Sequence, residues 1–241
     1  MKDLTNLRNL AAIALIVSAL VPAKGFADGA SRVTWQPSYS GSCEDCSLIG
    51  QQMPYSDLSG AHYVGADLSH ASLFGSVADN ARFDGVTGRY TDFSQTKLNN
   101  ARLQNATLTN ARFIGVEANG ADFSGAQIDF GKFSNGKLIG ANLTNVSATH
   151  IRAVGTDFSG ANASGAQFDY ANLIQSNFNG AQLSGASFKD SDISGAKFRD
   201  ARLAAADFSG AKNAGQADFA GACRSVQTRL PTGITLRLCT N

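Results

Sequence analysis

Every fifth residue of this chain follows one rule from Leu58 to Phe208, without an insertion or deletion. The 31 positions in this phase hold 11 Leu, 11 Phe, two Ile, one Tyr and six small residues. The residue two positions earlier is Ala in 18 of the 31 cases. A period of five fits neither the 3.6-residue turn of an α-helix nor the two-residue alternation of a flat strand. The repeat therefore excludes an ordinary helical or flat-sheet domain over most of the chain.

A five-residue period requires the backbone to turn a corner after each repeat. Four corners would close a square coil of twenty residues, with the large residue and the small one two before it pointing inward. The other three positions would face outward or form the corner, where Gly and Asn tolerate positive φ. With coils stacked at the strand spacing of about 4.8 Å, the 31 repeats predict a rod of about eight coils, on the order of 37 Å long.

An exchange of volume between the two inward positions supports this arrangement. Where the large residue shrinks to Gly88 or Ala153, the residue two before it grows to Val86 or Ile151. The same exchange pairs Val116 with Ala118 and Val146 with Ala148. Interiors are packed nearly as densely as crystals, so two residues that share one core are expected to compensate in this way.

The repeats resemble those of the pentapeptide-repeat family. Examples are Ala-Asp-Leu-Ser at 66–69, Ala-Asn-Leu-Thr-Asn at 141–145 and Ala-Asp-Phe-Ser-Gly at 206–210. The resemblance implies an all-β fold, a right-handed quadrilateral β-helix, over most of the chain. It does not settle function, because the family is functionally mixed; some relatives inhibit gyrase by mimicking DNA.

The segment 1–27 has the order of a secretory signal peptide. Lys2 and Arg8 precede an apolar run at 10–21, and Gly25-Phe26-Ala27 forms a small-x-small cleavage pattern. An uncleaved anchor is the alternative, although the run is short for a membrane span. We expect an exported protein, periplasmic or secreted (or in the thylakoid lumen of a cyanobacterium), with no integral membrane segment after cleavage.

The charge balance bears on the class of partner. Without the segment 1–27 the chain keeps 17 basic and 18 acidic residues, which argues against a nucleic-acid partner, because such binding neutralises many phosphates. A DNA-mimicking topoisomerase inhibitor would need a strongly acidic surface and a cytoplasmic chain. Charge and export signal both disfavour that alternative.

The ends of such a rod expose core and unpaired strand edges, so we expect caps. We assign residues 28–45 to an N-terminal arm or cap, 46–212 to the β-helix and 213–241 to a C-terminal cap. Residues 228–234 have the pattern of a strand, a turn and a strand, which predicts a hairpin in that cap.

The four cysteines lie at opposite ends of the rod. Cross-pairing between the ends would exceed the Cα separation of about 7 Å that a disulfide allows, and an oxidising compartment favours Cys223 with Cys239, closing the hairpin. Cys43 and Cys46 form either a small disulfide, free thiols, a thiol-active redox pair or half of a metal site, of which we favour the disulfide. The family resemblance points the same way, since a Cys-x-x-Cys ahead of the first repeat is familiar in exported members.

The outward positions show no catalytic constellation. His70 and His150 share a face but lie four coils apart, roughly 19 Å, and His62 is on another face. No Ser has His and Asp neighbours in stacked register, and Phe and Leu fill the coil interior. We therefore expect no enzyme, no cofactor and no metal.

One face stands out as a candidate for binding. Arg112, Lys132 and Arg152 project from three consecutive coils, diluted at the ends by Asp92 and Asp192, and apolar residues occupy the neighbouring slot, namely Phe74, Ile114, Val154 and Ile174. A basic column beside aliphatic side chains is typical of a surface for an acidic or amphipathic protein partner; ordinary surface variation is the alternative.

A second face is uncharged over six coils, with Thr87, Thr107, Gln127, Ser147, Gln167 and Ser187. We interpret it as hydrogen-bonded polar ladders, with self-association or ordered water as the alternatives. The sequence thus predicts a non-catalytic exported scaffold or protein-binding module whose partner is unknown; a homo-oligomer is not indicated.

Overall fold

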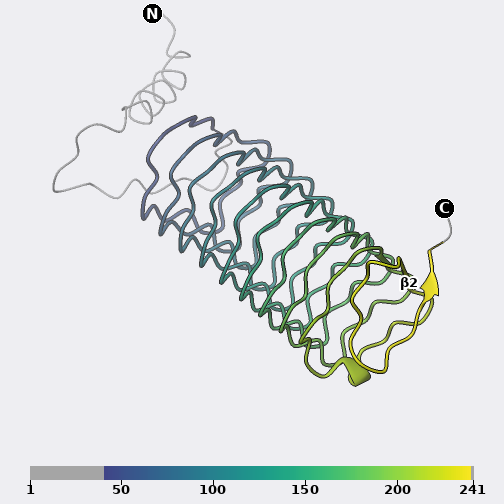
Figure 1. Cartoon of the computed structure of the whole chain (residues 1–241). Helices are drawn as coiled ribbons and strands as arrows, with labels where there is room; N and C mark the ends of the chain where they lie inside the picture. The colour runs from purple at the N-terminus through teal and green to yellow at the C-terminus, as the bar shows by residue number, and fades with distance from the viewer. Residues whose placement is uncertain (1–40, 240–241) are drawn as a thin grey trace, which may run out of the picture.

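The computed structural model describes residues 41–239, which form a β-helical rod of stacked coils (Figure 1). The signal peptide expected at 1–27 and residues 28–40 of the expected arm lie outside the described residues. None of the helices within 41–239 is long and apolar enough to cross a membrane.

Each coil takes twenty residues, as the sequence predicts. Parallel bridges join residue i to residue i+20, beginning with Ser42 to His62 and continuing without a break to Asp192 with Lys212. The first bridge lies four residues ahead of residue 46, so the stack begins within the segment assigned to the arm. One of the four ladders runs through Ser42, His62, Arg82, Arg102, Asp122, Asn142, Asn162, Gln182 and Arg202.

The core is a column inside the coils. Both predicted inward positions are buried in every repeat from 56 to 208, which confirms their orientation. Phenylalanine rings stack along the axis: the centroid of Phe113 lies 5.0 Å from that of Phe93 and 4.5 Å from that of Phe133. The volume-exchange pair Val116 and Ala118 is fully buried within this column.

Several hydroxyls in the small-residue slot are satisfied by the coil below. The Oγ1 of Thr96 donates to the carbonyl of Leu73 at 2.7 Å, and that of Thr156 donates to the carbonyl of Phe133 at 2.8 Å. A buried hydroxyl without such a bond would be costly, so these bonds explain why Thr replaces Ala at little expense.

The C-terminal end departs from the twenty-residue period. The 3-10 helix η1 (Ala214–Gln216) takes up one extra residue, so β2 (Cys223–Arg224) pairs with β1 (Arg202–Leu203) one position later than the period predicts, with Cys223 opposite Arg202. After β2 the chain comes back to the same side of the rod in fewer than twenty residues, because β3 (Arg237–Leu238) already pairs with β2, with Arg237 opposite Cys223. The cap is therefore a contracted final coil.

The predicted hairpin in this cap is wrong. β2 and β3 are parallel, and Arg229, inside the segment 228–234, bridges Asp207 of the coil below, also in parallel. The backbone does turn in this segment, with Gly233 at a φ of 85°, but the turn forms a corner of the coil and does not reverse a strand. Local turn chemistry alone does not distinguish these two outcomes.

Both expected cysteine pairs are within disulfide distance. The Cα atoms of Cys223 and Cys239 are 4.7 Å apart, and this bond ties the end of the contracted coil to β2. Those of Cys43 and Cys46 are 5.5 Å apart, at the first described coil.

Candidate binding face

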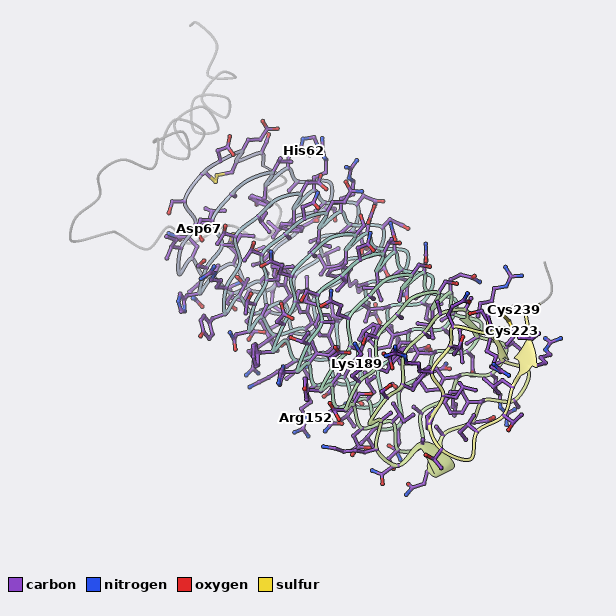
Figure 2. All side chains as sticks on the ribbon, viewed as in Figure 1. His62, Asp67, Arg152, Lys189, Cys223 and Cys239 are labelled. Carbon is purple, nitrogen blue, oxygen red and sulfur yellow. A yellow bond between two sulfur atoms is a disulfide. The ribbon has the colours of Figure 1, made fainter. Side chains whose placement is uncertain are left out.

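The three basic residues singled out from sequence lie in register on adjacent coils. Arg112 bridges Lys132, which bridges Arg152, and all three side chains are exposed. We call these three residues the basic column. Figure 2 shows Arg152 on the outer surface of the rod.

The charge of this column is only partly compensated. The Nε of Arg112 lies 3.4 Å from a carboxylate oxygen of Asp92, on the preceding coil. Within residues 41–239, neither Lys132 nor Arg152 forms an ion pair. Like charges one coil apart oppose each other, although water screens them. Two cations are therefore available to an acidic group from outside.

The apolar row beside the column is less exposed than the sequence suggests. Phe74, Ile114, Val154 and Ile174 are half-buried, because neighbouring coils about 4.8 Å away cover much of each side chain. Phe74 also packs edge-on against Tyr55, with ring centroids 5.6 Å apart. The row therefore contributes a shallow apolar border and not the exposed patch that we expected.

The exposed apolar surface of this face lies instead at one corner, which the sequence pattern did not reveal. His70, Tyr90, Phe130, His150 and Tyr170 occupy the corner position immediately before the basic face and are all exposed. We call these five residues the aromatic ridge. Reading the sequence with a period of twenty, in place of five, would have revealed them.

The uncharged face is built as a polar ladder. Its six residues, Thr87 to Ser187, bridge one another in register. The Oγ of Ser147 donates to Asp129 at 2.7 Å, and Ser187 donates likewise to Asp169. These bonds hold two of the six residues against carboxylates at the adjacent corner.

The histidines do not form a joint site. His70 and His150 each stack on a ring of a neighbouring coil, and His62 belongs to a different ladder. Across the part of the chain that the structure describes, no group of three or more His, Cys, Asp or Glu side chains is placed to hold a metal ion.

The carboxyl groups with shifted pKa values lie away from the basic face, at Asp57, Asp122, Asp207 and Asp218. For Asp218, the backbone N–H of Ala220 and the Arg199 guanidinium hold the pKa of the carboxyl below its usual range. Burial raises the pKa of Asp207, but hydrogen bonds from Ser209 and the charges of Lys189 and Arg229 outweigh it, so the net pKa is lowered. Because these pKa values are lowered, the ionised carboxylates stabilise the folded stack. They do not point to an acid–base pair.

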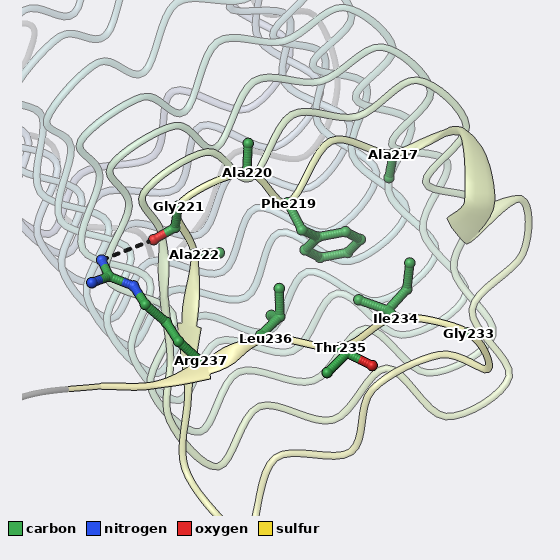
Figure 3. Close-up of a pocket in the computed structure, with 10 residues that line it drawn as sticks. All are labelled: Ala217, Phe219, Ala220, Gly221, Ala222, Gly233, Ile234, Thr235, Leu236 and Arg237. Carbon is green, nitrogen blue, oxygen red and sulfur yellow. Dashed lines mark hydrogen bonds between the residues drawn. The ribbon is translucent and has the colours of Figure 1, made fainter.

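A hollow of about 470 Å³ opens at the C-terminal end, where the cap crosses the last coil (Figure 3). Phe219, Ile234 and Leu236 supply its apolar lining, and Arg237 is the one ionisable side chain among the ten lining residues. Arg237 is already engaged, since its Nη2 donates to the carbonyl of Gly221 at 3.2 Å. This hollow therefore offers no acid–base pair.

Comparison with known proteins identifies the repeat. The family model described as pentapeptide repeats matches in 8 copies, at residues 55–87, 89–125, 121–162, 137–180, 166–203 and 181–212. None of the curated proteins compared with the chain matches it.

Two solved structures have a similar fold. One is HetL, a pentapeptide-repeat protein involved in heterocyst differentiation regulation in the cyanobacterium Nostoc sp. strain PCC 7120, with 24% identity and a TM-score of 0.59; the match covers 79% of this chain and 87% of HetL. The other is QnrB1, a plasmid-mediated fluoroquinolone resistance protein, with 19% identity and a TM-score of 0.50, covering 78% of this chain and 94% of QnrB1. At these identities the likeness concerns the fold alone.

Proposed function

Because this chain belongs to the pentapeptide-repeat family, whose members are generally structural or binding modules, we propose that it is an exported, non-catalytic binding module. It recognises an acidic protein partner through the basic column and the apolar border beside it. The observation that carries the proposal is the stacking of Arg112, Lys132 and Arg152 on adjacent coils, with Lys132 and Arg152 outside any ion pair of the described residues.

The filled interior supports a surface function. The inward positions are buried in every repeat from 56 to 208, and rings such as Phe113 and Phe133 stack along the axis. A rod of this kind offers its partner a long regular outer surface, as solenoid proteins do.

The thiol-active alternative has less support. Cys43 and Cys46 are buried, with 5% and 8% of their surface exposed, and lie within disulfide distance of each other. Thiol exchange requires access to a sulfur atom. Burial of both residues therefore favours a structural bond within the first described coil.

The test is a pull-down from the compartment in which the protein resides, quantified by mass spectrometry. The bait carries Arg112→Glu, Lys132→Glu and Arg152→Glu, and we expect its principal partners to fall by at least about tenfold relative to the wild-type bait. The matched control reverses three basic residues on other faces, Lys137→Glu, Lys197→Glu and Arg202→Glu, and should keep those partners. An unchanged partner set for the basic-column variant would sink the proposal.

A further inference from the structure

The corner beside the basic column carries a ladder of stacked aromatic rings. In the aromatic ridge, the centroids of His70 and Tyr90 are 5.2 Å apart. Those of Phe130 and His150, and of His150 and Tyr170, are each 4.9 Å apart. Asn110 interrupts the series, so five of six consecutive coils contribute a ring at this corner.

These rings occupy a backbone conformation that disfavours them. Each ridge residue has a φ between 57° and 61°, in the left-handed region. A Cβ is strained there, and another corner accordingly holds Gly or Asn at all seven positions from 65 to 185, with Asp45 and Ala205 at its two ends. Burial compensates only in part, since Tyr90, Phe130 and Tyr170 are 54%, 50% and 56% exposed. Strain kept at an exposed position points to a function outside the fold.

The ridge presents its ring edges to solvent, because the ring faces stack on one another. The edge of an aromatic ring is the positive side of its quadrupole, so it favours carboxylate oxygens. Phe130 and His150 each lie two residues before a member of the basic column, Lys132 and Arg152. Ridge and column therefore run side by side along the rod, and both favour negative charge.

The two acidic groups next to the ridge rings Phe130 and Tyr170 lie on the other side of this corner, whereas Asp92 and Asp192 lie toward the two ends of the column's own ladder. Asp129 and Asp169 precede the ridge residues Phe130 and Tyr170, and each accepts a hydrogen bond from the uncharged face, from Ser147 and Ser187. An acidic ligand is thereby directed toward the side of the basic column.

We propose that the strip between the aromatic ridge and the basic column binds an acidic amphipathic α-helix of a partner protein, lying along the rod. This rests on the proposed function and names its partner chemistry. Coils recur at about 4.8 Å, and residues one helical turn apart are about 5–6 Å apart, so carboxylates on successive turns meet Lys132 and Arg152. The ring edges of the ridge flank the same carboxylates, and the aliphatic stripe of the helix lies against the apolar border that includes Ile114 and Val154.

A carboxylated polysaccharide fits the ridge less well. Sugar rings stack on open aromatic faces, whereas both faces of His150 and one face each of Phe130 and Tyr170 are covered by stacking. The polysaccharide is therefore the competing ligand in the test.

The test measures binding of defined probes to the purified exported protein by calorimetry. The main probe is a stapled helix of about 15 residues with Glu on one stripe and Leu on the next, since shorter free helices are marginal in water. The comparators are a stapled helix of the same composition with scattered Glu, flexible poly-glutamate and a polyuronate. We expect the patterned helix to bind at least about tenfold more tightly than each comparator. Equal or tighter binding of poly-glutamate or polyuronate overturns the helix assignment.

Variants separate the ridge from the column. Phe130→Asn with Tyr170→Asn places at both corners the residue that Asn110 already has there, and we expect at least about tenfold weaker helix binding. Ala205→Asn places Asn in the same backbone conformation at a corner away from the basic face and should alter affinity by less than about twofold. Thermal unfolding verifies that the double variant folds. If it does not fold, the single variant Phe130→Asn is used in its place.

The outcomes distinguish the two proposals. If Lys132→Glu with Arg152→Glu abolishes helix binding while the ridge variant binds like wild type, the ridge inference fails and the basic column stands. If the wild type binds none of the helices but the basic-column variant still loses its partners in the pull-down, the inference fails alone. If neither variant changes any binding, both proposals fail.

Discussion

At the scale of single residues, the fold depends on the two inward side chains of each repeat sharing one volume. Ile151 and Ala153 are both almost fully buried, with the larger residue in the slot that usually holds Ala. The sequence predicts this exchange because the two positions recur in a fixed phase. It does not predict which rings stack, since that depends on coils twenty residues apart, as for Phe113 and Phe133.

Exchanging this pair tests the shared volume. Ile151→Ala should lower the free energy of unfolding by about 2–5 kcal/mol, because it leaves a cavity. Adding Ala153→Ile, which restores the usual order of small then large, should recover most of the loss. Urea unfolding followed by circular dichroism measures both. Additive losses in the double variant would contradict the shared core.

Two vertically adjacent corners test the cost of the left-handed conformation. Gly185 has a φ of 70° with open space where a Cβ would lie, and Ala205, on the next coil, has a φ of 56°. Gly185→Ala should destabilise by about 1–2 kcal/mol and Ala205→Gly should stabilise by about 1 kcal/mol. Thermal unfolding measures the change in stability of each variant. If both variants were destabilised, or both stabilised, the backbone strain inferred for the aromatic ridge would be contradicted.

At the scale of elements, the coil and the presence of a C-terminal cap could be predicted from the sequence, but the path of the chain within the cap could not. Every five-residue repeat places its two inward residues and its corner in the same way, so the coil can be predicted from the repeat alone. The cap depends on one extra residue taken up by η1 and on a final return between β2 and β3 that is shorter than a full coil. Turn residues such as Gly233 are compatible with either a hairpin or a coil corner, so only the pairing partner decides.

The two disulfides should differ in how much they stabilise. Cys223 and Cys239 are 16 residues apart, and Cys239→Ser should cost about 3 kcal/mol in the chain-entropy view, with faster amide exchange in the final coil. Cys43 and Cys46 are only three residues apart, so Cys46→Ser should cost clearly less. Calorimetric unfolding of both variants compares them; an equal or larger loss for Cys46→Ser would contradict this account of the cap.

Asp207 should make the cap sensitive to acid. Its carboxylate accepts from the backbone N–H of Ser209 at 2.9 Å and from Arg229 at 3.2 Å, and its pKa in the folded protein is lowered. Its contribution is therefore present above the unfolded pKa of about 3.9 and is lost as the pH falls through the folded pKa. Asp207→Asn should cost about 1 kcal/mol at neutral pH and flatten this dependence. Unfolding measured between about pH 6 and 2 tests it, and an unchanged acid dependence would contradict the role of Asp207.

At the scale of the whole molecule, the faces of the rod carry information that the five-residue repeat hides. The basic column was visible in the sequence because its charges recur every twenty residues. The aromatic ridge was missed because the corner was expected to hold only residues that tolerate positive φ. Its rings become a surface only once the coils are stacked and His150 is found between Phe130 and Tyr170.

Site-specific photocrosslinking in the native compartment tests most directly whether this face binds a partner. Asn172 and Asn162 occupy equivalent outward positions of one coil, on the ladder of the basic face and on the opposite ladder. A photoreactive residue at 172 should give crosslinks to a partner protein that are absent when the same residue is placed at 162. Crosslinks of equal yield from both positions, or from 162 alone, would contradict a binding module that works through its basic face.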